Sequence, residues 1–319
     1  MLPSADDRSG PAQPERGRAP RRVVIFTDDP GWHGGVLCRA LAQRHLSASL
    51  VSLKDCYLDL SGDRPQVMIP GFPGPAPAGA FVRGVPGGTL EEVILRLDLL
   101  HALDHLGVPV YNQGRAIERT VDKALTSFLL LAAGIPTPRT WVLEGPAAAR
   151  QVTAGVLASG DTLVLKPLFG SQGEGLQRIT QLADFDALTP PNGVFYLQVF
   201  IERPSPPYCD YRVLVVNGVA RYAMSRSSAH WITNRALGAV CAATPLLPAM
   251  RELAEAASAA VQTDYAGVDL LQDARGRWWV GEVNGVPAWW GLQTVYGAGV
   301  TAAIVEGFCA VLAARDKAL

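Results

Sequence analysis

The chain has 319 residues, and 49% of them are hydrophobic, which is typical of a folded protein with a sizeable core and excludes a wholly disordered chain. Its 28 basic and 29 acidic residues nearly cancel, so the charge gives no reason to expect a nucleic-acid partner. No stretch reaches the roughly 18–20 apolar residues that a membrane span needs, and we expect no membrane partner. The five cysteines lack metal-binding spacing, which favours reduced packing residues in a cytoplasmic protein.

The chain begins with a segment, residues 1–21, that is rich in Pro, Gly and charge and has no apolar run. This composition predicts a disordered tail and not a secretory signal. The next segments read as a strand at 22–27, a helix at 35–45 and a second strand at 49–53. A strand–helix–strand order predicts a parallel sheet.

A second helix is marked by Thr89 and by Glu92 three residues later, which form the pattern of a capping box. Gly107 is expected to end this helix, and a strand should follow at 108–111. The helix should bury an apolar face made of Leu90, Val93, Ile94, Leu97, Leu100 and Leu103. Residues 22–113 therefore read as a first α/β domain.

The middle of the chain, residues 114–197, mixes helices and strands and reads as a central subdomain. Helices are predicted at 117–133 and 145–158, and strands at 162–166, 176–179 and 195–201.

The last part, residues 198–319, is predicted to be an antiparallel sheet with helices packed on it. The pair Asn217-Gly218 predicts a tight hairpin between two apolar strands. The predicted strands are 210–216, 219–225, 267–272 and 278–284, and the predicted helices are 246–262 and 301–314.

Oxygen-bearing side chains gather on the last predicted hairpin. Glu282 and Asn284 are two residues apart, so they point to the same face of a strand, and Asp269 can join them from the partner strand. Three such oxygen ligands suit Mg²⁺ held together with substrate phosphates. A surface hairpin with solvated acids would have the same pattern.

A glycine-rich loop follows a predicted strand that ends at Lys166. Gly170, Gly173 and Gly175 are followed by another strand and not by a helix, which excludes a dinucleotide-binding fingerprint. Glycines at a hairpin tip let backbone N–H groups approach a polyphosphate closely. Lys166 and Lys123 are candidate phosphate-binding cations. A flexible loop and two solvated lysines are the plainer interpretation.

Further polar residues lie on both sides of the predicted hairpin at Asn217. Arg226 and Asn234 could bind a carboxylate or a phosphate, whereas Asp210 and Arg212 on one strand suggest a surface ion pair. The tryptophans Trp231, Trp289 and Trp290 could stack on a ring or pack in the core.

Taken in chain order, several short runs resemble the ATP-grasp superfamily, and within it the RimK-type α-L-glutamate ligases. These runs are IERTVDK at 117–123, LAAGIPTPRT at 131–140, VLKP at 164–167, YLQVFI at 196–201, DYR at 210–212, GVD at 267–269 and EVN at 282–284. The resemblance implies an α/β plus α+β ATP-grasp fold. Such a fold has an N-terminal parallel α/β domain, a central lid subdomain and a C-terminal antiparallel sheet with helices.

The resemblance also implies a role for each motif residue. Residues implied to bind ATP are Lys123, Lys166, Gly170, Ser171, Gln172, Gly173 and Gly175 at the phosphates, and Gln198, Val199, Phe200 and Ile201 at the adenine. Residues implied to hold two Mg²⁺ ions, with Mn²⁺ as an alternative, are Asp269, Glu282 and Asn284. Catalytic residues on the substrate side are implied to be Arg212, Arg226 and Asn234.

The sequence departs from the family pattern at three places. Val199 stands where the family often has an acidic residue, and Arg235 is not followed by the Gly-Gly of the ribosomal-protein-modifying members. The loop at 202–209 is longer and Pro-rich, so no family lysine can be assigned there.

The implied activity is an ATP-dependent carboxylate–amine ligase that forms an amide through an acyl phosphate. The segments 224–234 and 284–289 resemble members linked to methanopterin-type cofactors, which favours addition of L-glutamate to a pterin or furan cofactor. Two alternatives stay open: a ligase that modifies a peptide, a protein C-terminus or an amino-acid carrier, and a non-catalytic ATP-binding regulatory protein. The resemblance also suggests a homo-oligomer.

Overall fold

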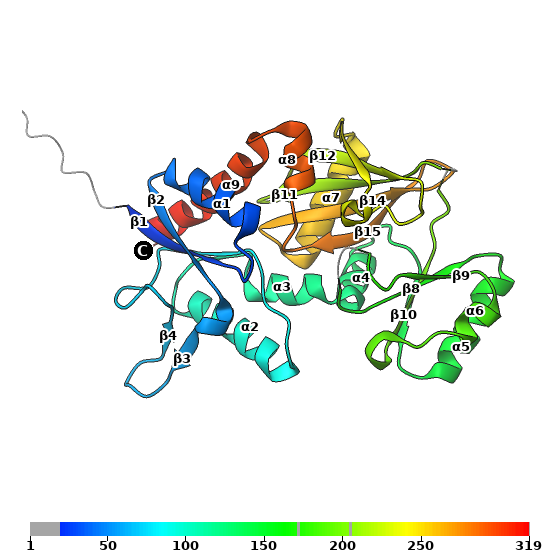
Figure 1. The fold of residues 1–319 in the computed structure, drawn as a ribbon, viewed down its shortest axis with the longest axis horizontal. Helices are drawn as coiled ribbons and strands as arrows, with labels where there is room; N and C mark the ends of the chain where they lie inside the picture. The colour runs from blue at the N-terminus through cyan, green and yellow to red at the C-terminus, as the bar shows by residue number, and fades with distance from the viewer. Residues whose placement is uncertain (1–19, 171–172, 204–205, 319) are drawn as a thin grey trace, which may run out of the picture.

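The computed structural model describes residues 20–170, 173–203 and 206–318, which form three groups of helices and strands along the chain (Figure 1). Nearly all of the expected N-terminal tail, as far as residue 19, lies outside the described residues, and so do Ser171 and Gln172 of the glycine-rich loop.

The first group is a four-stranded parallel sheet in the order β2-β1-β5-β6, which confirms the predicted N-terminal parallel α/β domain. Its strands are β1 (Arg21–Phe26), β2 (Leu46–Val51), β5 (Ala80–Val82) and β6 (Val110–Tyr111). Helix α1 (Gly31–Ala42) packs against β2, and a small hairpin, β3 (Tyr57–Asp59) and β4 (Gln66–Met68), follows. Helix α1 begins four residues before the predicted start because Pro30, whose fixed φ suits a helix start, caps it.

Helix α2 (Leu90–His105) starts with the predicted capping box between Thr89 and Glu92, and its predicted buried face is confirmed only at Leu100 and Leu103. Leu90 and Ile94 are exposed, and the residues that α2 buries are Arg96, Leu99, Leu100 and Leu103. Arg96 can be buried because its Nη1 donates to the carbonyl oxygens of Pro86 at 3.0 Å and Gly87 at 2.8 Å. A polar residue with internal partners thus takes a core position that the apolar pattern assigns to leucine.

The helix predicted at 117–133 is two helices, α3 (Gly114–Val121) and α4 (Lys123–Ala132), which meet at Asp122. The Asp122 carboxylate accepts hydrogen bonds from the N–H groups of Ala124 at 2.8 Å and Leu125 at 3.0 Å. Such an N-cap satisfies backbone donors that a new helix leaves free, so it starts α4 at this point. Lys123 is therefore the first residue of a helix and not part of a helix interior.

The second group is an antiparallel sheet in the order β7-β10-β8-β9, at the lower right of Figure 1. The strands are β7 (Thr140–Leu143), β8 (Leu163–Lys166), β9 (Gln177–Ile179) and β10 (Phe195–Val199), with helices α5 (Pro146–Ala158) and α6 (Leu182–Asp186). The sheet has its own core, which includes Leu165, Phe185 and Leu197. Strand β7 and helix α6 were not predicted from the sequence.

The third group is a five-stranded antiparallel sheet in the order β13-β12-β11-β14-β15, which confirms the predicted C-terminal sheet. The strands are β11 (Tyr208–Val216), β12 (Val219–Ser228), β13 (Val240–Thr244), β14 (Tyr265–Gln272) and β15 (Trp278–Asn284). Asn217 and Gly218 turn between β11 and β12 with φ values of 48° and 74°, as the predicted tight hairpin requires. Helix α7 (Pro248–Val261) packs on this sheet.

Two C-terminal helices return the chain to the N-terminal sheet. Helix α8 (Trp290–Tyr296) packs on β12 and β13, and α9 (Gly299–Ala318) packs on α1 and β11, as Figure 1 shows. One core cluster joins Ile25 and Phe81 of the first sheet to Leu214 of the third sheet and Phe308 of α9. We propose the predicted units 22–113, 114–197 and 198–319 as the domains, although β10 crosses the second boundary.

No single helix among residues 20–318 that the structure describes is both long and apolar enough to cross a membrane. The helices α8 and α9 meet both conditions only when taken together, and they are bent by 119° from each other.

Candidate active site

A cleft with a volume of about 130 Å³ lies between the second and third sheets. Strands β8 and β10 contribute Lys166 and Gln198 to its wall, and the C-terminal sheet contributes Arg226, Asp269 and Glu282. A smaller cavity adjoins the cleft, lined by Lys123, Lys166 and Glu282 among others. Predicted site residues from α4, from the second sheet and from the third sheet therefore line these two adjoining cavities.

Two lysines and one carboxylate form the centre of this site. Lys123 lies with its Nζ 3.8 Å from Oε1 of Glu282, and the same ammonium donates to the carbonyl oxygen of Gly170 at 2.7 Å. Lys166 shares both cavities with Glu282. Burial, opposed by Glu282 and assisted by Lys123, lowers the pKa of Lys166. Two neighbouring cations that share one acid suit a polyanionic ligand, which would supply the missing negative charge.

Lys166 is held in place by a buried amide. Its Nζ donates to Oε1 of Gln198 at 2.6 Å, and Nε2 of Gln198 donates to the hydroxyl oxygens of Thr140 at 3.0 Å and Tyr196 at 3.1 Å. Tyr196 in turn lies 2.7 Å from the hydroxyl of Ser127 on α4. The side chain of Gln198 therefore orients the lysine, and Tyr196, Thr140 and Ser127 are site-supporting residues that the sequence did not indicate.

The chain at the end of β10 uses two of its backbone donors inside the protein. The N–H of Val199 donates to the carbonyl of Arg139 at 2.9 Å, and the N–H of Phe200 donates to that of Thr162 at 2.8 Å. Within the described part of the chain, the N–H of Ile201 has no hydrogen-bond partner. A free donor at the cleft edge can bind a ring nitrogen of a nucleobase.

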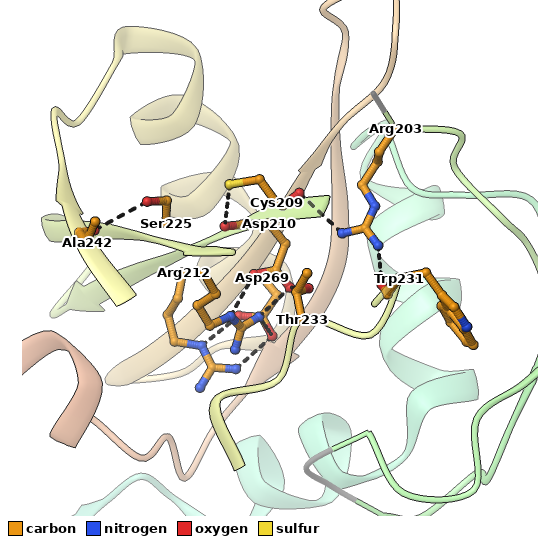
Figure 2. A network of polar contacts seen from close by, with 10 residues as sticks. Arg203, Cys209, Asp210, Arg212, Ser225, Trp231, Thr233, Ala242 and Asp269 are labelled. Atoms are coloured by element: carbon orange, nitrogen blue, oxygen red, sulfur yellow. Dashed lines mark hydrogen bonds and ion pairs between the residues drawn. The ribbon is translucent and has the colours of Figure 1, made fainter. Parts of the chain in front are cut away.

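An aromatic and cationic wall stands beside this donor. The rings of Phe200 and Trp231 meet edge to face with their centroids 5.7 Å apart, and the guanidinium of Arg178 lies 4.1 Å from the Phe200 ring. Arg203 fixes Trp231 because it donates to the carbonyl oxygens of Trp231 and Cys209 (Figure 2). Arg178 and Arg203 were not predicted as site residues, because a single arginine in a Pro-rich loop or a short strand gives no motif.

On the C-terminal sheet, acids and arginines pair across strands (Figure 2). Arg212 donates to both carboxylate oxygens of Asp269 at 2.6 and 2.7 Å, and Arg226 donates in the same way to Asp210 at 2.7 and 2.8 Å. Arg226 also lies 3.0 Å from Asp269, and Thr233 donates to Asp210 at 2.6 Å. The suggested surface pair between Asp210 and Arg212 is wrong, since cross-strand neighbours lie closer than residues two apart on one strand.

These pairs set the charge of Asp269. Burial alone would raise its pKa, but Arg212 and Arg226 outweigh burial and lower the pKa of Asp269. Arg226 is itself buried, and the charges of Asp269 and Asp210 outweigh its burial and raise its pKa. Both groups are therefore ionised at neutral pH.

The predicted metal-binding oxygens lie on facing strands. Asp269 is directly opposite Glu282, and the pairing shifts at Gly281, the extra residue of a bulge. Asn284 lies opposite Gly267 and donates to its carbonyl oxygen at 3.2 Å, which leaves the amide oxygen as an acceptor. In residues 20–318 as described, no three His, Cys, Asp or Glu side chains form a metal-binding group. Two carboxylates and one amide oxygen fit a hard cation, provided that it shares Asp269 with the arginines.

The glycine-rich loop lies against the segment that carries Asn234 at Gly173, whose φ is 78°. A Cβ at this residue would lie 2.7 Å from Oδ1 of Asn234 and 2.8 Å from the Ile232 side chain. Only glycine allows this approach, so the loop and the 232–234 segment fit closely together. The predicted site residues Asn234, Arg226 and Asp269 line the cleft, whereas Arg212 touches it only through Asp269.

Comparisons with known proteins agree with this geometry. Residues 120–307 match the model of the RimK-like ATP-grasp domain, and the chain belongs to this family. It is 35% identical over 224 residues to the tetrahydromethanopterin:alpha-L-glutamate ligase of Methanococcus maripaludis, which covers 68% of this chain and 73% of the relative. It is 26% identical to the alpha-aminoadipate–LysW ligase LysX of Saccharolobus solfataricus, over 58% of this chain and 68% of that protein.

The fold also matches solved structures. The ATP-grasp ligase PsnB, in complex with minimal precursor, Mg and ADP, superposes with a TM-score of 0.68 at 20% identity, covering 90% of this chain and 96% of PsnB. The fold is thus the ATP-grasp fold. The protein is an ATP-dependent carboxylate–amine ligase, and ligases of this family use ATP and a divalent metal.

Proposed function

We propose that this ligase adds L-glutamate to a carboxylate of a pterin or furan one-carbon cofactor. The support for this substrate is the 35% identity to a tetrahydromethanopterin:alpha-L-glutamate ligase over two thirds of the chain. The support for the chemistry is the site, where Lys123 and Lys166 flank Glu282 beside a cleft.

The single observation that carries the proposal is this group of two lysines and one acid. Without a ligand, one carboxylate partly balances two ammonium groups, and burial already lowers the pKa of Lys166. A triphosphate would complete the charge balance, and both lysines would neutralise charge that moves during phosphoryl transfer.

The reaction would proceed in two steps that the cleft can hold. A carboxylate oxygen of the acceptor bonds to the γ-phosphorus of ATP while the bond to ADP breaks, which gives an acyl phosphate. The amino nitrogen of glutamate then bonds to the acyl carbon, phosphate leaves, and the nitrogen loses a proton. We propose that Arg226 and Asn234 line the acyl-phosphate side, and that Arg212 acts on it through Asp269.

The residues proposed to hold the metal are Asp269, Glu282 and Asn284, with two Mg²⁺ ions, or Mn²⁺ in their place. Bound metal would neutralise phosphate charge and act as a Lewis acid. We propose that Lys123, Lys166 and the loop with Gly170, Gly173 and Gly175 bind the phosphates. Ser171 and Gln172 of that loop lie outside the described residues.

The adenine would lie where β10 ends. We propose that the free N–H of Ile201 binds the edge of the adenine ring and that Phe200 and Trp231 pack beside this ring. Val199 uses its N–H inside the protein, and Gln198 acts by orienting Lys166.

The test is ADP release that depends on both L-glutamate and an acceptor, with products weighed by mass spectrometry. Tetrahydromethanopterin-type, furan-type and peptide acceptors are compared with Mg²⁺ and ATP. An acceptor product heavier by one or more glutamyl units would establish the proposal and select the acceptor. If ADP release needs an amino acid other than glutamate, the proposed substrate is wrong.

A second candidate is a ligase that acts on a peptide, a protein C-terminus or an amino-acid carrier. The similarity to LysX favours it, although the identity is lower. Mass gain on a peptide acceptor and none on the cofactors would decide for this alternative. We also propose a homo-oligomer from the family resemblance. The molar mass of the whole chain in solution, measured by light scattering, tests this proposal.

A further inference from the structure

A partly buried arginine, Arg83, follows β5 at the carboxyl edge of the parallel sheet. Its Nη1 donates to the carbonyl oxygen of Val286 at 3.3 Å. Its Nε is buried and has no hydrogen-bond partner, and within residues 20–318 as described no carboxylate forms an ion pair with its guanidinium. Burial lowers the pKa of Arg83, and the distant charges of Tyr265 and Asp29 only partly oppose this.

The two arginines that are fully buried in the described part of the chain are better compensated. Arg96 donates to two carbonyl oxygens and lies 3.5 Å from Glu92, and Arg226 pairs with Asp210 and Asp269. A buried guanidinium without an acid destabilises a fold, because water is lost and no opposite charge replaces it. Arg83 therefore has the character of a group whose counter-charge comes from a ligand.

The side chains that pack around Arg83 include an aromatic group. Its guanidinium carbon lies 5.4 Å from the centre of the buried Trp289 ring, and the His33 ring packs edge-on against Trp289 at 4.6 Å. Nε2 of His33 accepts a hydrogen bond from the N–H of Trp289 at 3.3 Å, and burial and Arg83 lower the pKa of His33 to about 4. His33 is thus neutral at pH 7, and Trp32, which is 37% exposed, continues the aromatic wall toward solvent.

This group lies beside the proposed reaction centre. Val286, which accepts from Arg83, is two residues after Asn284. The next residue, Pro287, approaches Gly267 so closely that a Cβ there would lie 2.9 Å from Pro287 and 3.3 Å from Arg212. The carboxyl edge of a parallel sheet is also where α/β domains commonly bind ligands. Arg83 is therefore linked through Val286 to the segment that directly follows Glu282 and Asn284 of β15.

We propose that Arg83 binds a carboxylate of a substrate that is not the carboxylate being activated, with Trp289 and Trp32 packing against the substrate's carbon skeleton. The inference rests on the proposed function and names the group that anchors a substrate in it. A carboxylate of this kind can come from the incoming amino acid or from the acceptor. Both present the same planar pair of oxygens, which a guanidinium binds with two hydrogen bonds.

The test compares Arg83→Met and Arg83→Lys with the matched buried-arginine control Arg96→Met. We expect Arg83→Met to raise one substrate KM about 10- to 100-fold while the KM for ATP stays unchanged, since one charged hydrogen-bonded contact is lost. Arg83→Lys should recover only part of this, because lysine cannot donate two parallel hydrogen bonds. A raised KM for L-glutamate assigns the carboxylate to the amino acid, and a raised KM for tetrahydromethanopterin assigns it to the acceptor. Unchanged KM values for both would overturn the inference.

A thermal measurement on the free protein separates a binding role from a structural one. Arg83→Met should raise the Tm of the ligand-free chain, because it removes an uncompensated buried charge, whereas Arg96→Met should lower it. If Arg83→Met instead lowers the Tm as Arg96→Met does, Arg83 is a structural residue and the inference fails.

The same protein samples distinguish this failure from failure of the proposed function. If the wild-type chain shows no turnover with any acceptor, the proposed function fails, and Arg83 is then tested by binding alone. L-glutamate or tetrahydromethanopterin at millimolar concentration should raise the Tm of the wild type and of Arg96→Met but not that of Arg83→Met. Equal shifts in all three proteins, or no shift in any of them, would overturn the inference.

Discussion

Glu282 is the residue on which the two cavities of the site converge. It faces Lys123 at 3.8 Å, lies opposite Asp269 on the neighbouring strand and is about one-third exposed. A carboxylate at this position can bind either a metal cation or the ammonium groups of Lys123 and Lys166. An amide carries no negative charge and would bind both kinds of cation more weakly.

Glu282→Gln keeps the size of the side chain and removes its charge. We expect ADP release to fall by about two orders of magnitude or more, since metal-assisted charge neutralisation would be lost. The control is Glu306→Gln on the exposed face of α9, which should be as active as the wild type. Unchanged ADP formation in Glu282→Gln would exclude Glu282 from the metal site.

Asp264 gives the chain a pH-dependent stability. It lies between α7 and β14, where burial raises its pKa from 3.8 to about 6. The folded state therefore holds a proton that the unfolded state has released between about pH 4 and pH 6. Stability from this group is complete below about pH 4 and is lost as the pH rises through 6, by about 3 kcal/mol at most for a shift of about two pKa units.

Asp264→Asn should remove this loss. Its Tm should exceed that of the wild type at pH 7, and the difference should vanish near pH 4. The exposed Asp63→Asn serves as the control in the same thermal scans. A Tm difference that is the same at both pH values would show that titration of Asp264 does not contribute.

At the scale of elements, the break between α3 and α4 positions a proposed ATP-binding cation. Asp122 ends one helix and caps the next, so Lys123 leaves the first turn of α4 toward Gly170 and Glu282. In a continuous helix this lysine would follow the helix surface and would have no fixed relation to β15.

Asp122→Ala removes two capping hydrogen bonds and should lower the free energy of unfolding by about 1 kcal/mol. Because the start of α4 then loosens, the KM for ATP should rise as well. Asp122→Ser restores a capping oxygen without the charge and should recover most of both effects. If serine recovers neither the Tm nor the KM, the charge of Asp122 matters and its capping role does not.

The β14–β15 pair shows a second way in which an element sets the site. The extra residue Gly281 bulges from β15, so Glu282, which lines the cleft, shares one face of the strand with Asn284. Val280 and Val283 are buried on the other face, in the core beneath α7. Without the bulge, Val280 would share a face with Glu282, as residues two apart on a regular strand do. The bulge thus reconciles a buried core face with a polar site on one strand.

At the scale of the whole molecule, α9 joins the N-terminal sheet to the C-terminal sheet in one core. The second sheet, β7-β10-β8-β9, has a core of its own and is the proposed lid. Phe308 of α9 is fully buried against Phe81 and Tyr111 of the first sheet. The first and third groups should therefore unfold together, and the lid should be able to open separately.

Phe308→Ala should destabilise the protein by about 3–5 kcal/mol, since a large buried ring is lost. Hydrogen exchange should then speed up in β1, β5 and β11 together. The matched change in the lid, Phe185→Ala, should speed exchange in β8 and β10 and leave β1 and β11 protected. Equal effects of the two variants on all sheets would show a single cooperative unit.

The sequence by itself determined the type of most elements, the family and the local signals. The Asn217-Gly218 hairpin, the capping box at Thr89 and the paired strands that carry Asp269 and Glu282 rest on turn geometry, capping and side-chain periodicity, which act over a few residues. The order of the short motifs was enough to indicate the ATP-grasp fold.

Only the tertiary structure decided which polar residues meet. The buried face of α2 was predicted only in part, because Arg96 finds carbonyl partners in a loop. The pairing of Arg212 and Arg226 depends on the register of neighbouring strands. No sequence motif marks Arg83 as a binding residue. Its unpartnered Nε and its contact with Trp289 arise only when distant parts of the chain come together. Local sequence sets backbone preferences, but hydrogen-bond partners and charge balance depend on contacts that the folded chain alone creates.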